Sequence, residues 1–309
     1  MSDAALTTAP PPQTRPQSGG FWPQLWRQFR NHPGGVAGLI VFTFIVLAVF
    51  LGPYIHTIDP NKIDIKAKNQ GPSLLHPFGT DNLGKDMLAQ VLAGGQISLA
   101  VGMTAMALAL LVGTLIGVLS GYSRKLDGPL MRLTDLFLAL PLLPLLLVII
   151  MLFRDTLRAA FGPETGIFIL IVFVIGITSW MHTARIVRGD VLAIKSQEFI
   201  LAAKSSGMRE YRIILKHILP NVMGPVLVIA TINLAAAVLT EATLSFLGVG
   251  MPPTYPSLGT LIRFGQQYLF SGEWWILLFP SLVLVLLALS INLFGDWLRD
   301  RFDPTTQRT

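Results

Sequence analysis

The stretch ISLAVGMTAMALALLVGTLIGVLSG, residues Ile97–Gly121, decides the fold class of this chain. It carries no charged residue and, as a helix rising about 1.5 Å per residue, is long enough to cross a hydrocarbon core of about 30 Å. A membrane-spanning strand needs only about 9–11 residues and alternates polar with apolar side chains, which this stretch does not. An open sheet would also leave backbone groups unpaired in lipid, so the sequence predicts a transmembrane helix.

Five further apolar stretches predict an all-α membrane protein with six transmembrane helices. These stretches are Gly34–Ile55, Leu133–Phe153, Gly166–Ile186, Val222–Thr240 and Trp274–Phe294. The composition agrees, because 52% of the 309 residues are hydrophobic, only 13% are charged, and the mean hydropathy is +0.61. A soluble domain carries about 25% charged residues. So little polar surface cannot cover a soluble globule of this size.

Two features of the predicted helices concern their packing and shape. Small residues recur every four positions in the second helix, which lets a neighbouring helix approach closely. They are Ala105, Ala109, Gly113, Gly117 and Gly121. Prolines interrupt three other predicted helices and are expected to bend them. They are Pro141 and Pro144 in the third helix, Pro225 in the fifth and Pro280 in the sixth.

The basic residues predict the orientation of the chain in the membrane. Most of the 23 Lys and Arg residues flank the helices on the side that holds both chain ends. The positive-inside rule places that side in the cytoplasm. The net charge of +6 is then a topology signal, and we expect the lipid bilayer but no nucleic acid as a partner.

The predicted order of segments follows from these helices. Residues 1–33 are rich in Pro, Gln, Ser and Gly and are expected to form a flexible cytoplasmic tail. A first transmembrane helix at 34–55, an external loop at 56–95 and a five-helix core at 96–296 follow, with a cytoplasmic tail at 297–309. The chain has no cysteine, which excludes disulfides and zinc fingers.

A long polar segment, Val187–Asn221, lies on the cytoplasmic side between the fourth and fifth predicted transmembrane helices. Residues 197–206 are expected to form a short helix, with Ser196 capping its start and Gly207 ending it in a left-handed conformation. One stripe of this helix is mostly small, which favours docking into a partner's groove. The stripe is Phe199, Ala202, Ala203 and Ser206. A helix lying on lipid and a solvated connector are the alternatives.

The sequence contains no motif that predicts catalysis or metal binding. Residues Gly79–Asp86 nearly match the phosphate-binding pattern G-x-x-x-x-G-K-[ST], but Asp86 replaces the required hydroxyl and the segment is expected outside the cell. Its glycines are expected to form turns, with Asp81 capping a short helix. The five histidines lack ligand spacing, so we expect no catalytic residue and no cofactor bound by this chain.

One ionisable residue near a predicted helix is a candidate for the translocation path. Glu241 ends the fifth helix, and Asn233 lies two turns below it on the same broad face. A charge inside a bilayer persists when it faces protein or a water-filled path. The alternative, given equal weight, is a structural bond from Glu241 to a neighbouring helix end.

Several ordered motifs resemble those of one family of membrane transporters. The residues Ala202-Ala203, Gly207 and Ile218-Leu219-Pro220 are similar to the coupling motif of ATP-binding-cassette (ABC) importer permeases, although Leu201 stands where that motif has Glu. Glu198 and Lys204 are candidates to substitute for it. Three further stretches are similar to signatures of the C-type permease of dipeptide, oligopeptide and nickel importers. They are His76–Asp86, Glu241–Gly250 and Leu293–Asp300.

The resemblance implies a type I importer permease fold with a cytoplasmic coupling helix that docks on an ATPase. Its implied coupling residues are Glu198, Phe199, Ala202, Ala203, Lys204 and Gly207. It also implies two ATPase subunits that carry ATP and Mg, a second homologous permease and an external solute-binding protein. The chain would then move peptides across the bacterial cytoplasmic membrane by alternating access. Nickel, glutathione or another small solute are alternative substrates, and an autonomous channel or a membrane enzyme are alternative classes.

Overall fold

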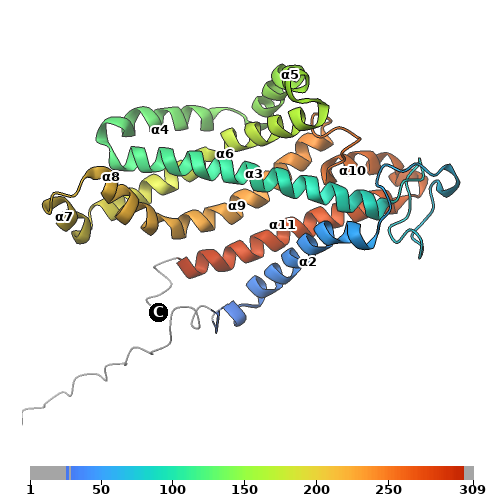
Figure 1. Ribbon diagram of the computed structural model, residues 1–309, viewed down its shortest axis with the longest axis horizontal. Coiled ribbons are helices and arrows are strands. Elements are labelled where there is room, and N and C mark those ends of the chain that lie inside the picture. The colour runs from blue at the N-terminus through green and yellow to red at the C-terminus, as the bar shows by residue number, and fades with distance from the viewer. Residues whose placement is uncertain (1–25, 28, 303–309) are drawn as a thin grey trace, which may run out of the picture.

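The computed structural model describes residues 26–27 and 29–302 of the chain, so most of the predicted tail at 1–33 lies outside the described residues. Within those residues the regular elements are helices, and an isolated bridge joins Thr80 to Asp86. Figure 1 shows an elongated bundle in which α3 runs along the length of the molecule. The prediction of an all-α membrane protein is confirmed.

Among the described residues, five helices are long and apolar enough to cross a membrane. They are α2 (Pro33–Ile55), α3 (Met87–Tyr122), α6 (Pro163–Lys195), α9 (Leu219–Phe246) and α11 (Trp274–Phe302). Two of them run past the predicted boundaries. The α3 helix begins ten residues before Ile97, inside the predicted external loop, and α11 continues through the charged residues that follow Phe294. Apolar composition marks the part of a helix in lipid, not where the helix ends.

The predicted third helix, Leu133–Phe153, is broken in the structure. It is divided between α4 (Arg124–Ala139) and α5 (Leu142–Phe161), whose axes differ by 92°. The break falls at Leu140, whose backbone is extended with φ −79° and ψ 139°, and at Pro141. A proline has no N–H to donate and disfavours helical backbone in the residue before it. The described part of the chain therefore holds up to six segments long and apolar enough to cross a membrane, one of them bent.

The small-residue stripe of α3 packs against α6, as the sequence predicts. Ala105 and Ala109 are fully buried. A β-carbon added at Gly113 would lie 2.6 Å from the Cβ of Thr183, and one at Gly117 would lie 2.7 Å from the Cβ of Val187. Such distances are shorter than van der Waals contact, so a side chain at either position would clash. Only glycine allows the two backbones to approach this closely.

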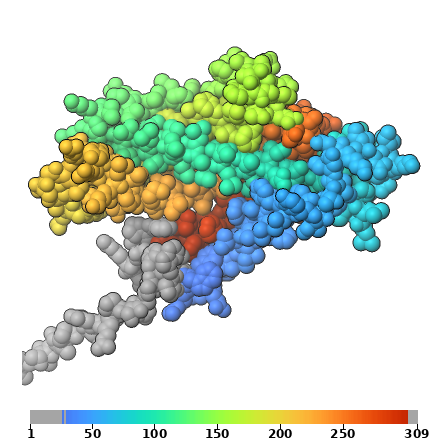
Figure 2. Space-filling model, viewed as in Figure 1, coloured from blue at the N-terminus to red at the C-terminus, as the bar shows by residue number. Residues whose placement is uncertain are grey.

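The remaining helices place polar segments at the two ends of this pair. Figures 1 and 2 show α2 beside α11 on one flank and α4 with α5 on the other. At one end lie α7 (Glu198–Ser205) and α8 (Glu210–Ile213), which continues through the π-helix η2 (Ile214–Ile218) into α9. At the opposite end lies the loop 56–86, which contains η1 (Ile65–Ala67), with α10 (Leu258–Gly265) and η3 (Gln266–Ser271).

Candidate functional site

The α7 helix ends as the sequence predicts. Gly207 has φ +75°, the left-handed conformation expected of it. The N–H of Met208 donates to the carbonyl of Ala203 at 3.2 Å, and the N–H of Gly207 donates to that of Lys204 at 3.0 Å. This pair of bonds is the Schellman motif, which satisfies carbonyls at the end of a helix. The chain therefore turns sharply after α7 and enters α8.

The start of α7 differs from the prediction. The expected cap from Ser196 is wrong, because the Ser196 hydroxyl donates to the carbonyl of Ala193 at 2.9 Å, in the last turn of α6. The N-cap position is Gln197, which makes no side-chain capping bond. Ser196 has helical backbone angles of −87° and −3°, whereas an N-cap residue needs an extended backbone.

One face of α7 holds the helix on the bundle. Ile200 is 0% exposed and belongs to a buried group that we call the α7 cluster. Its other members are Val118 of α3, Val187 and Val191 of α6, Ile213 of α8, Ile218 of η2, and Val222 and Val226 of α9. Ala203 packs on the edge of this cluster, and the Lys204 ammonium lies 5.4 Å from the centre of the Tyr122 ring, at the end of α3. Sequence patterning did not identify Ile200 or Tyr122.

The opposite face of α7 is open. Phe199 is 41% exposed, and Ala202, Ser206 and Glu198 are also exposed. The predicted small stripe is therefore divided, with Ala203 packed on the α7 cluster and its three other members exposed. No ion pair between Glu198 and Lys204 forms among the described residues, since Lys204 is engaged by Tyr122 instead. The open face is the part of α7 that is free to meet a partner.

The segment after α7 turns at Gly207 and then joins a membrane-crossing helix. The residues Ile218-Leu219-Pro220 lie where the π-helix η2 becomes α9, and Pro220 falls in the first turn of α9. Helix runs continuously over Glu210–Phe246. Because π-turns mark local irregularities in a helix and often occur at functional sites, this junction is a place where the helix can deform. The Phe199 ring lies 6.2 Å from the ring of His217 in η2.

The translocation-path candidates lie inside the helix packing. Glu241 is 0% exposed, and its carboxylate accepts from the Ser98 hydroxyl of α3 at 2.8 Å and from the Ser245 hydroxyl at 2.6 Å. The Ser98 oxygen in turn accepts from the N–H of Leu258 at 3.2 Å, at the start of α10. Asn233 donates to the Thr183 hydroxyl of α6 at 3.0 Å. These contacts support the structural alternative for Glu241, which joins α3, α9 and α10.

Two substitutions of Glu241 separate this structural role from a transport role. Glu241→Gln keeps a group that can accept from and donate to the two serines, so we expect a thermal midpoint close to that of the original chain. Glu241→Ala leaves buried hydroxyls unsatisfied at about 1–3 kcal/mol each, so we expect a clearly lower midpoint. Thermal unfolding in detergent measures both. A stable Glu241→Gln variant that no longer transports would instead assign the carboxylate to the path.

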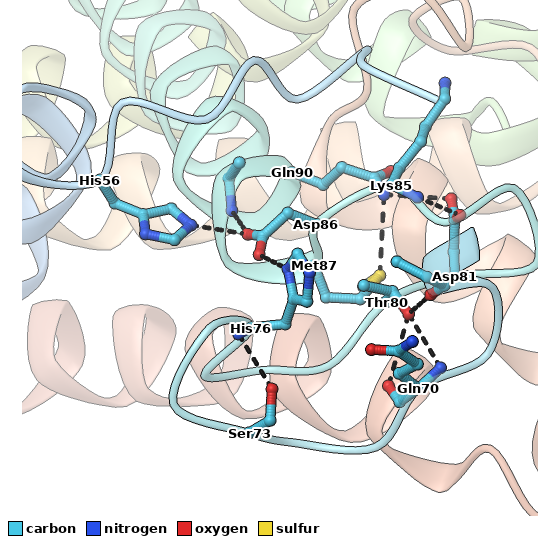
Figure 3. Close-up of polar contacts among 12 residues, drawn as sticks. His56, Gln70, Ser73, His76, Thr80, Asp81, Lys85, Asp86, Met87 and Gln90 are labelled. Atoms are coloured by element: carbon cyan, nitrogen blue, oxygen red, sulfur yellow. Dashed lines mark hydrogen bonds and ion pairs between the residues drawn. The ribbon is translucent and has the colours of Figure 1, made fainter. Parts of the chain in front are cut away.

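The opposite end of the bundle holds a second polar cluster, shown in Figure 3. The Asp86 carboxylate, 1% exposed, contacts His56 Nε2 at 2.9 Å and His76 Nδ1 at 2.7 Å. It also accepts from the N–H of Ala89 at 2.7 Å and so caps α3. The expectation that Asp81 is the capping residue is wrong. Asp81 instead accepts from the backbone N–H groups of Leu83 and Lys85 in the turn that follows it, because α3 starts only after Asp86.

The turns of this loop depend on two of its glycines. Gly79 and Gly84 have φ of +75° and +73°, which confirms that the near-match to a phosphate-binding loop is a pair of turns. A β-carbon at Gly84 would lie 1.7 Å from the carbonyl oxygen of Asp64. The interior of the loop is therefore filled by the chain itself.

Comparison with known proteins identifies the family. Residues 109–308 match the family described as binding-protein-dependent transport system inner membrane component, and residues 20–72 match the N-terminal TM domain of oligopeptide transport permease C. The chain is 36% identical to the dipeptide transport system permease protein DppC of Bacillus subtilis, over 92% of this chain and 85% of the relative. It is 35% identical to the oligopeptide transport system permease protein OppC of the same organism, over 93% and 91%.

A solved structure supports the fold. A chain of the inward-facing MetNI methionine ABC transporter superposes with a TM-score of 0.55 over 70% of this chain and 98% of that one, at 22% identity. The likeness to this structure concerns the fold, whereas the family match and the relatives identify a transport component rather than an enzyme. The chain belongs to the binding-protein-dependent transport system inner membrane component family and is a multi-pass permease subunit of a bacterial ABC importer.

Proposed function

We propose that this permease carries di- or oligopeptides into the cell by alternating access. In this proposal it assembles with a second homologous permease, two ATPases that bind ATP and Mg, and an external solute-binding protein. The names of the relatives support a peptide substrate. The observation that carries the coupling role is α7 itself, a short helix with an open outer face and an inner face fixed to five other helical segments through Ile200.

The proposed transmission runs from α7 to two membrane-crossing helices. The open face is formed by Glu198, Phe199 and Ala202. A displacement of α7 caused by contact at this face is transmitted to α9 through Ile200, the α7 cluster and the continuous helix that starts at Glu210. It reaches α3 through Lys204 and the Tyr122 ring. Gly207 sets the angle between α7 and α8, so a displacement of α7 moves α8 in a fixed direction.

Reconstitution tests this function. The assembled transporter in liposomes is expected to accumulate a labelled dipeptide only when ATP and the binding protein are supplied, and the chain alone should not hydrolyse ATP. Excess nickel or glutathione in the same assay separates the alternative substrates. Uptake without ATP would indicate a channel, and hydrolysis by the isolated chain would indicate a membrane enzyme.

We also propose that both termini and α7 face the cytoplasm. The start of α2 and the end of α11 lie toward the end of the bundle that carries α7, which supports one common side (Figure 1). The excess of Lys and Arg on that side supports the cytoplasm.

Single cysteines test this orientation, since the natural chain has none. Ser205→Cys and Leu74→Cys are expected to react with a membrane-impermeant maleimide from opposite sides, with only Leu74→Cys labelled in intact cells. Leu74 is fully exposed, whereas Asn69 in the same loop has φ +51° and donates to Glu273 at 3.0 Å, so it tolerates replacement less well. Labelling of both cysteines in intact cells would refute the orientation.

A further inference from the structure

A polar cavity lies between α7 and the bundle, on the side of α7 away from its open face. Its volume is about 370 Å³, within the range of small-ligand sites. The end of α3, the start of α4, the end of α6 and α7 meet there (Figure 1). It is lined by Ser120, Gly121, Arg124, Asp127, Leu192, Lys195, Ser196 and Lys204.

The cavity has an excess of positive charge. Three cations line it, namely Arg124, Lys195 and Lys204. Its one acidic lining residue, Asp127, is neutralised by Arg188, whose guanidinium donates to both carboxylate oxygens at 2.5 and 2.8 Å. Glu210, from α8, is the further acidic group that acts on Lys195. The three cations are therefore only partly balanced.

Both lysines contact the same residue, Tyr122, and the Lys204 side chain is exposed. The Lys195 ammonium donates to the carbonyl of Tyr122 and lies 5.1 Å from the centre of its ring, and Lys204 lies 5.4 Å from the same centre. Both charges thus converge on one aromatic ring at the end of α3. Holding like charges together costs free energy unless an anion lies between them.

A buried hydroxyl completes the lining. Ser120 is 1% exposed, and its Oγ has no hydrogen-bond partner among the described residues. A buried polar group without a partner costs free energy, so such an atom beside a cavity indicates that something else supplies the bond.

We propose that this cavity binds a phosphate group. A phosphate oxygen accepts charge-assisted bonds from Arg124, Lys195 and Lys204, and a further bond from the Ser120 hydroxyl. Basic pockets between transmembrane helices at the membrane surface are sites for anionic lipid headgroups, and free phosphate offers the same chemistry. Because Lys204 belongs to α7, a bound phosphate would brace the coupling helix against α3 and α6.

The test uses the full chain and a matched pair of charge substitutions. Arg124→Gln removes a cavity cation, whereas Lys125→Gln removes an equal charge from the exposed neighbouring residue, which does not line the cavity. In the first arm, the protein is placed in nanodiscs that contain phosphatidylcholine and phosphatidylglycerol. Native mass spectrometry then counts the phosphatidylglycerol molecules that stay bound to the protein. In lipid-free detergent, calorimetry measures binding of inorganic phosphate. We expect Arg124→Gln to weaken binding roughly tenfold and Lys125→Gln by less than about twofold.

The two arms identify the source of the phosphate group. Retention of one phosphatidylglycerol that Arg124→Gln abolishes indicates a lipid headgroup, and saturable inorganic phosphate binding with the same dependence indicates a free anion. Ser120→Ala removes no hydrogen bond to any residue that the structure describes, so the variant should fold normally yet bind several-fold more weakly. Equal binding by the original chain and Arg124→Gln in both arms, or equal loss in Lys125→Gln, would overturn the proposal.

Discussion

Replacing Gly117 by valine is expected to destabilise the packing of α3 against α6 strongly. A β-carbon there meets the Cβ of Val187 at 2.7 Å and the carbonyl oxygen of Ala184 at 2.8 Å. A rigid backbone atom stands on one side and a buried core side chain on the other, so neither can move aside. Overpacking a buried site costs about 1–3 kcal/mol, and a clash with backbone falls at or above the upper end. The ratio of folded to unfolded protein should fall more than about tenfold.

The matched control is a glycine in the facing helix. Gly189, on α6, has no atom within 4 Å of an added β-carbon. Gly189→Ala should therefore leave folding unchanged or improve it slightly, because alanine favours a helix over glycine by about 1 kcal/mol. Size-exclusion profiles of a fluorescent fusion measure both variants. Normal folding of Gly117→Val would mean that α3 and α6 are not packed as closely as described.

Patterns that one segment carries by itself could be predicted from the sequence. The apolar stretches predicted five of the six membrane-crossing helices as single helices, and the four-residue repeat in α3 predicted its contact face. Both patterns depend on residues along one segment. Gly207 was predictable for the same reason, since a left-handed residue after a short helix favours glycine whatever surrounds it. The resemblance to importer permeases then gave the coupling role proposed for α7.

Features that depend on a distant partner could not be predicted. Ile200 is one of many apolar residues in its segment, and only the fold shows that it is the residue of α7 that enters the buried cluster. The sequence does not decide between a structural and a transport role for Glu241. The Ser98 hydroxyl, which donates a hydrogen bond to its carboxylate, lies 143 positions away in the sequence. Ser196 and Asp81 were assigned as caps from spacing alone, but α6 extends to Lys195 and α3 begins after Asp86.

Coupling between ATP hydrolysis and uptake is expected to fail when the open face of α7 is filled. Ala202 is exposed and Ala203 packs on the α7 cluster, so tryptophan at the two positions tests different contacts. Ala202→Trp should fold normally but lose most co-purification with the ATPases and most uptake. Ala203→Trp should instead loosen α7 from the bundle, because an overpacked contact costs about 1–3 kcal/mol. Its thermal midpoint should fall, which distinguishes the two.

The direction of α7 is tested separately at Gly207. With φ +75° and no atom within 4 Å of an added β-carbon, a side chain there meets strain but no clash. Gly207→Val should cost roughly 1–2 kcal/mol in this conformation, whereas Gly207→Asn should cost less, because asparagine tolerates it. Uptake per assembled transporter should therefore fall strongly for valine and little for asparagine, with both chains inserted normally. Equal uptake by Gly207→Val and Gly207→Asn would show that the angle set at Gly207 has no part in transmission. For the preceding test, normal assembly of Ala202→Trp with the ATPases would exclude the open face as the ATPase contact.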